Sequence, residues 1–109
     1  MDPRNPHRLA EARSLALHQE VARRLVEHPE LLDGIRERVR AWLVDGTVAR
    51  PYAEAWQALL ERAPEDVAIA IVDPSERARD MRQCSPFAGL LPSRDRWRIL
   101  RELSEGVLR

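Results

Sequence analysis

The chain has 109 residues, of which 44% are hydrophobic and 33% charged, a composition that excludes a disordered chain and suits one modest core. Its 18 basic residues, all of them Arg, balance its 18 acidic residues, which excludes a general electrostatic attraction to nucleic acid or membrane. One Cys excludes an intramolecular disulfide, and the lack of a signal peptide or a membrane-length apolar run predicts a cytoplasmic protein with no membrane partner.

Two amphipathic helices are predicted in the first part of the chain, over residues 5–27 and 29–44. Apolar residues recur at helical spacing in both, and each helix starts at a Pro, which suits a first helical turn. The apolar stripe consists of Leu17, Val21, Leu25, Leu32, Ile35, Val39, Trp42 and Leu43. Because His28-Pro29 leaves only a short connection, we expect these helices to pack as an antiparallel hairpin over residues 1–46.

Several shorter helices are predicted over residues 47–109, so that the whole chain forms a single all-α domain. Their ranges are 51–62, 64–72, 75–83 and 93–107. Residues 67–72 are also a fair strand by composition, but a lone strand has nothing to pair with, and we assign them to a helix.

The segment from Gln83 to Trp97 has the most strongly specified local conformation. It contains two helix-start signals, and we expect Ser85 to cap a single turn and Ser93 to cap the last helix. Its apolar residues Phe87, Leu90 and Leu91 are predicted to plug the end of the helical core.

No residue is predicted to be catalytic, cofactor-binding or metal-binding. His7, His18 and His28 are spaced by eleven and ten residues, whereas metal ligands on one helix need a spacing of three or four. Cys84 has no adjacent base and no glycine-lined oxyanion site, so we interpret it as a small buried thiol. We therefore predict that the protein is not an enzyme; an enzymatic function would need a site around Cys84 and His18.

Nucleic-acid binding is the alternative function. Residues 64–83 have the outline of a degenerate helix-turn-helix, whose turn lacks Gly. Its second helix carries Arg77, Arg79 and Arg82, which would contact DNA in a transcriptional regulator. Acidic residues on the same helix would repel phosphate and offset much of this attraction.

The favoured function is the binding of another protein. Trp, Tyr and Arg are enriched at interface hot spots, and a core this small can bury only some of the five aromatic rings. Trp97 is the ring we most expect to be partly exposed, because arginines flank it. We therefore predict that Arg94, Trp97, Arg98 and Arg101 bind the partner. The alternatives that all five rings belong to the core, and that the protein forms a homodimer, stay open.

The second half of the chain also resembles a known group of proteins. Its Ser85-Pro86-Phe87-Ala88-Gly89 motif is similar to a recurrent pattern in small, largely uncharacterised bacterial helical proteins. The pattern also includes Tyr52-Ala-Glu-Ala-Trp56, Asp73-Pro-Ser-Glu-Arg-Ala-Arg79 and Gln83-Cys84 before the motif, and Arg96-Trp97 after it. Such proteins are often the antitoxin-like or regulatory half of a two-gene module, so the resemblance implies a toxin encoded nearby as the partner. It implies no functional residue.

Overall fold

The computed structural model describes residues 6–107, and within this range the chain is all-α, as predicted. The helices are α1 (Pro6–Glu27), α2 (Leu31–Asp45), α3 (Arg50–Leu60), α4 (Pro64–Ala70), α5 (Glu76–Arg82) and α6 (Ser93–Val107). None of these helices combines the length and the apolar character that crossing a lipid bilayer requires.

Local signals that are visible in the sequence begin and end several helices. Pro51 and Pro64 occupy the first turns of α3 and α4, as predicted. Ser75 caps α5, its hydroxyl accepting a hydrogen bond from the Ala78 N–H at 3.2 Å. Gly46 ends α2 in the left-handed conformation (φ 72°), which Gly adopts without steric cost.

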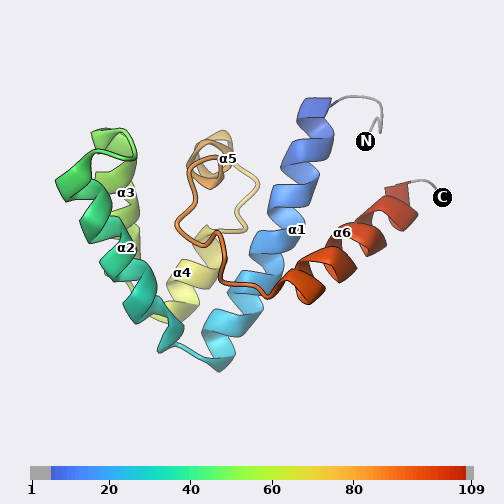
Figure 1. The fold of residues 1–109 in the computed structure, drawn as a ribbon, viewed down its shortest axis with the longest axis horizontal. Coiled ribbons are helices and arrows are strands. Elements are labelled where there is room, and N and C mark those ends of the chain that lie inside the picture. Colours follow the sequence, from blue (N-terminus) through green and yellow to red (C-terminus); the bar gives the residue numbers. More distant parts are fainter. Residues whose placement is uncertain (1–5, 108–109) are drawn as a thin grey trace.

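The chain reverses direction between α1 and α2, as a hairpin requires, but each helix finds its main partner elsewhere (Figure 1). Residues 28–30 form the connecting turn, so α2 begins at Leu31 rather than at Pro29. From this turn the two helices diverge; α1 packs chiefly on α4 and α6, whereas α2 packs on α3. The predicted two-helix unit of residues 1–46 is therefore open, and later helices complete the packing of each arm.

The core combines apolar residues from five helices with the segment that connects α5 to α6. Its buried members are Val21, Leu25, Leu32, Ile35, Val39, Trp56, Leu60, Val67, Ile71, Phe87, Leu91 and Ile99. The ring of Phe87 makes edge-to-face contacts with Trp56 and His18, at centroid distances of 5.8 and 6.2 Å. Phe87 and Leu91 are buried and Leu90 packs against them, which confirms that these three residues plug the core.

Residues 85–91, here called the 85–91 turn, are held by hydrogen bonds to two other elements. The Ser85 hydroxyl accepts the Phe87 N–H at 3.2 Å, which confirms the predicted cap. Arg38 of α2 donates to the carbonyl oxygens of Pro86 and Ala88, at 2.7 and 2.6 Å. The turn is thus bonded to α2, and it contacts α1 through the site described next.

The predicted cap at Ser93 is wrong by one residue. Helix α6 already begins at Ser93, and the carbonyl oxygen of Pro92 accepts the N–H groups of Asp95 and Arg96, both at 3.0 Å. Pro92 therefore occupies the capping position, and Ser93 lies in the first turn.

Candidate functional site

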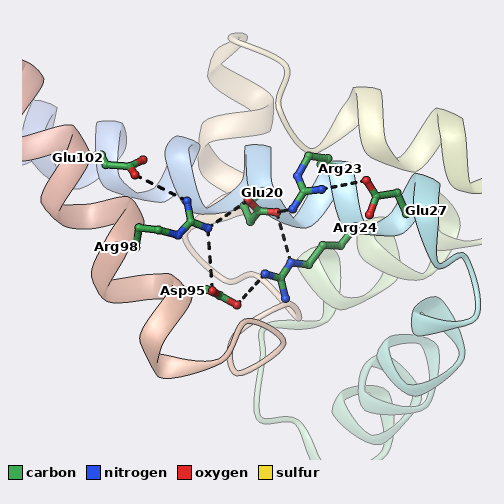
Figure 2. A network of polar contacts seen from close by, with 7 residues as sticks. All are labelled: Glu20, Arg23, Arg24, Glu27, Asp95, Arg98 and Glu102. Carbon is green, nitrogen blue, oxygen red and sulfur yellow. Dashed lines mark hydrogen bonds and ion pairs between the residues drawn. The ribbon is translucent and has the colours of Figure 1, made fainter.

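Helix α6 is attached to α1 by a network of ion pairs (Figure 2). The guanidinium of Arg24 donates to the carboxylate of Asp95 in the first turn of α6, with Nη2 and Oδ2 2.7 Å apart. Arg98, one turn further along α6, lies 3.8 Å from Glu20 of α1. It also lies 4.0 Å from Asp95 and 3.7 Å from Glu102. The pairs Arg24–Asp95 and Arg98–Glu20 thus join α6 to α1, whereas the other two lie within α6.

The charges of this network stabilise one another. The hydrogen bond from Arg24 lowers the pKa of Asp95 below its ordinary value and raises the pKa of Arg24 itself. Burial alone would raise the pKa of Glu20, but hydrogen bonds from Arg23 and Arg24 lower it overall. The carboxylates therefore keep their charge to lower pH than free carboxylates do, and the ion pairs persist over that range.

The predicted partner-binding residues share one side of α6, since they stand at i, i+3, i+4 and i+7. We call this surface, made of Arg94, Trp97, Arg98 and Arg101, the Trp97 face. The Trp97 side chain is 75% exposed, so the expectation that this ring is exposed is confirmed and the alternative of an all-core set of aromatics is wrong. Arg94 and Arg101 are also exposed, whereas Arg98 is shared with the ion-pair network.

The structure separates the three arginines of the nucleic-acid alternative. Arg82 is only 7% exposed, and its Nη1 donates to two backbone carbonyls after α4, at 3.1 and 2.8 Å. Arg79 is exposed and lies 3.7 Å from the Glu11 carboxylate of α1, and Arg77 is exposed. The guanidinium of Arg82 is thus largely buried and bonded to the backbone, unlike the exposed side chains of Arg77 and Arg79. DNA binding by the remaining residues of the 64–83 segment stays a prediction.

His18 and Ser85 form a hydrogen-bonded pair. His18 is 7% exposed, its Nδ1 lies 2.7 Å from the Ser14 carbonyl oxygen, and its Nε2 lies 2.8 Å from the Ser85 hydroxyl. A carbonyl oxygen only accepts, so we assign the proton to Nδ1, and Nε2 accepts the hydroxyl proton of Ser85. Burial lowers the pKa of His18, and the charge of Arg82 lowers it further, while the bond to Ser14 opposes both. His18 is therefore neutral at pH 7.

Cys84 does not take part in this pair, although it precedes Ser85. Its thiol points to the Met81 carbonyl oxygen, with a sulfur–oxygen distance of 3.5 Å. Burial raises the pKa of the thiol, which disfavours the thiolate that a nucleophile needs. The thiol is half-buried, close to the small buried group that the sequence predicts. Among residues 6–107, the hydrogen bonds of His18 go to Ser14 and Ser85, and that of the Cys84 thiol goes to Met81.

A cavity of about 300 Å³ opens beside the His18–Ser85 bond. Its walls are mainly apolar and come from α1, from the 85–91 turn and from α6. The lining residues include Leu17, His18, Val21, Ser85, Phe87, Leu91 and Arg96. The sequence indicates this cavity only weakly, because its walls come from segments that are distant along the chain. The only local hint is that His18 falls on the apolar face of its helix, between Leu17 and Val21.

Metal binding has no visible support in the structure. Across residues 6–107, no group of three or more His, Cys, Asp and Glu side chains is arranged so that it could hold a metal ion. The candidate sites among the described residues are the Trp97 face, the His18–Ser85 pair and the neighbouring cavity.

Comparisons with known proteins find no matching family model, no matching curated protein and no matching solved structure. The similarity of the Ser85–Gly89 motif to small helical bacterial proteins therefore stays a prediction. Function has to be inferred from the geometry of the described residues alone.

Proposed function

We propose that this protein is a non-enzymatic interaction module whose protein partner docks on the Trp97 face. The observation that carries the proposal is the 75% exposure of Trp97, the one aromatic ring among the large exposed apolar side chains of residues 6–107. An indole in water exposes a large apolar area, and Trp and Arg are the side chains that most often dominate binding energy at interfaces. The Trp97 face combines both types on one helix.

The anchoring of α6 supports the same proposal. Binding to a mobile helix costs the free energy of ordering that helix. A helix that is already held in place avoids most of this cost, and the partner therefore binds more tightly. The contact of Arg24 with Asp95, at 2.7 Å, and the surrounding ion pairs hold α6 against α1 before any partner arrives (Figure 2). Trp97 and Arg94 are thus presented from a defined position.

Charge indicates the chemistry of the partner. Arg98 is offset by nearby carboxylates, but Arg94 and Arg101 leave the Trp97 face positive. A second copy of the chain meeting it through the same face would bring these arginines together, which disfavours a symmetric homodimer. We infer a different protein, with an apolar pocket for the indole and carboxylates around it. In the antitoxin-like role, this partner is a toxin encoded nearby. The free Cys84 thiol fits a reducing compartment, so we place the interaction in the cytoplasm.

The test is direct binding to the partner identified by co-purification from the native host, starting with the product of the neighbouring gene. By calorimetry, Trp97→Ala should weaken binding by about 30-fold or more, the loss typical of a hot-spot residue. Val44→Ala is the matched control, because Val44 is 90% exposed on α2, away from α6, and this variant should bind normally. Equal binding by Trp97→Ala and the wild type would refute the proposal. Salt-dependent retention on duplex DNA that is lost in Arg77→Ala/Arg79→Ala would favour the alternative of a DNA-binding regulator.

A further inference from the structure

The cavity beside His18 has the features of a small-ligand site, independent of the protein partner proposed above. We propose that it binds a small monocarboxylate with a compact apolar body, whose carboxylate pairs with Arg96. Three observations carry this inference: the apolar walls, the hydrogen-bonded polar pair in the wall, and Arg96 at the α6 side, whose side chain has no polar partner among residues 6–107.

The walls select an apolar ligand body. Leu17 and Val21 of α1 line the cavity together with Phe87 and Leu91 of the 85–91 turn. Small-molecule sites are typically lined in this way, with a few polar groups that fix orientation. A volume of about 300 Å³ lies at the lower end for such sites, which suits a compact ligand with one ring or a branched alkyl group.

The His18–Ser85 pair in the cavity wall needs no hydrogen-bond acceptor from a ligand, because its donors are already paired. The Ser85 hydroxyl donates to His18 Nε2 at 2.8 Å and accepts the Phe87 N–H at 3.2 Å, so its donor is used. His18 has both ring nitrogens bonded, since Nδ1 lies 2.7 Å from the Ser14 carbonyl oxygen. A ligand can therefore place an apolar group against this wall without leaving a buried donor unpaired.

Arg96 supplies the charge that the rest of the cavity lacks. Arg24, Arg38, Arg82 and Arg98 are bonded to carboxylates or carbonyl oxygens, whereas the Arg96 side chain has no hydrogen bond or ion pair with another residue in the described range 6–107. The adjacent carboxylate of Asp95 is engaged by Arg24 at 2.7 Å and does not neutralise Arg96. A guanidinium binds a carboxylate through two parallel hydrogen bonds, and its position in the first turn of α6 adds the positive end of the helix dipole.

The experiment uses the full chain, with phenylacetate as the probe and phenylacetamide as its neutral counterpart. Both are titrated at matched ionic strength while the methyl resonances of Leu17, Val21 and Leu91 are followed by NMR. Phenylacetate should shift these methyl groups saturably, with a Kd about tenfold lower than that of phenylacetamide. Arg96→Gln should remove this difference by weakening phenylacetate alone. Arg94→Gln, two residues away on the Trp97 face, should preserve it.

Three results would overturn the proposal: no saturable shift of these methyl groups, equal affinity for acid and amide, or a difference that survives in Arg96→Gln. The Arg96→Gln variant should fold normally because Arg96 is exposed, and its thermal melting confirms this. Because Trp97 does not line the cavity, Trp97→Ala should leave phenylacetate binding intact, so this test is separate from that of the protein partner.

Discussion

The imidazole of His18 and the hydroxyl of Ser85 are 2.8 Å apart although 67 residues separate them in the chain. This bond joins α1 to the 85–91 turn, and the same turn is bonded to α2 through Arg38. Phe87 of the turn also packs against the ring of His18. His18 therefore contacts the 85–91 turn through both a hydrogen bond and an aromatic contact.

Stability should fall as the pH drops below about 6.5, the ordinary pKa of a histidine. Burial lowers the pKa of His18, so the unfolded chain binds a proton at a pH where the folded chain does not, and the free energy of unfolding decreases as the pH falls through that window. The slope from one such residue is at most about 1.4 kcal/mol per pH unit. Urea unfolding at several pH values between about 7.5 and 5.5 measures it.

In His18→Gln this slope should be reduced, while His28→Gln should keep it because it leaves the His18–Ser85 bond in place. The ordinary pKa values of Asp95 and Glu20 are 3.8 and 4.5, and both are lowered, so these carboxylates lose their stabilising charge only at lower pH. An unchanged slope in His18→Gln would contradict the assignment.

Ser85→Ala should destabilise the protein by about 1–3 kcal/mol, because it removes the acceptor of the Phe87 N–H and leaves a buried nitrogen of His18 without its donor. The matched control is Ser93→Ala, at an exposed position in the first turn of α6, which should change stability by no more than about 0.5 kcal/mol. Chemical denaturation of both variants provides the measurement, and equal losses would show that the 85–91 turn does not depend on Ser85.

Asp95→Asn should loosen α6 selectively. The variant loses the charge that pairs with Arg24 at 2.7 Å and with Arg98 at 4.0 Å, so the amides of α6 should exchange hydrogen faster than those of α2 and α3. Glu102→Gln is the control, since Glu102 is 60% exposed and contacts only the outer side of Arg98. Hydrogen exchange by mass spectrometry distinguishes local opening of α6 from global destabilisation. Uniform acceleration in all helices would argue against a local role for the network.

Arg82→Met should destabilise the protein by about 2–4 kcal/mol although Met retains much of the apolar side chain. Its guanidinium donates to the carbonyl oxygens of Ile71 and Asp73, and the variant leaves both without this donor. Arg77→Met, at an exposed position on the same helix, should stay within about 0.5 kcal/mol of the wild type. Thermal unfolding of both variants measures the difference. Equal stability of the two variants would show that the buried hydrogen bonds of Arg82 do not stabilise the fold.

Helix positions follow closely from local sequence, because prolines and caps act within one turn. Pro51 and Pro64 lie in the first turns of α3 and α4, Ser75 caps α5, and Gly46 ends α2. The exposure of Trp97 could also be predicted, since charged residues on both sides disfavour burial.

Contacts between distant segments could not be predicted in the same way. Arg82 belongs to a run of alternating charges that is typical of a solvated helix face, and only the folded chain shows that carbonyl oxygens after α4 compensate its burial. The cavity beside His18 and the packing of α1 on α4 and α6 likewise depend on how distant helices meet in space, and the apolar periodicity of a single helix does not specify this.

The arrangement of helix partners has a consequence for synthesis on the ribosome. Helix α2 packs on its immediate successor α3, so this pair can form as soon as both have emerged. Helix α1 packs on α4 and α6, and its apolar face has to wait for segments that are translated much later. We expect the α2–α3 pair to form first and α1 to dock near the end, which makes the earliest helix of the nascent chain the one that most needs protection from aggregation.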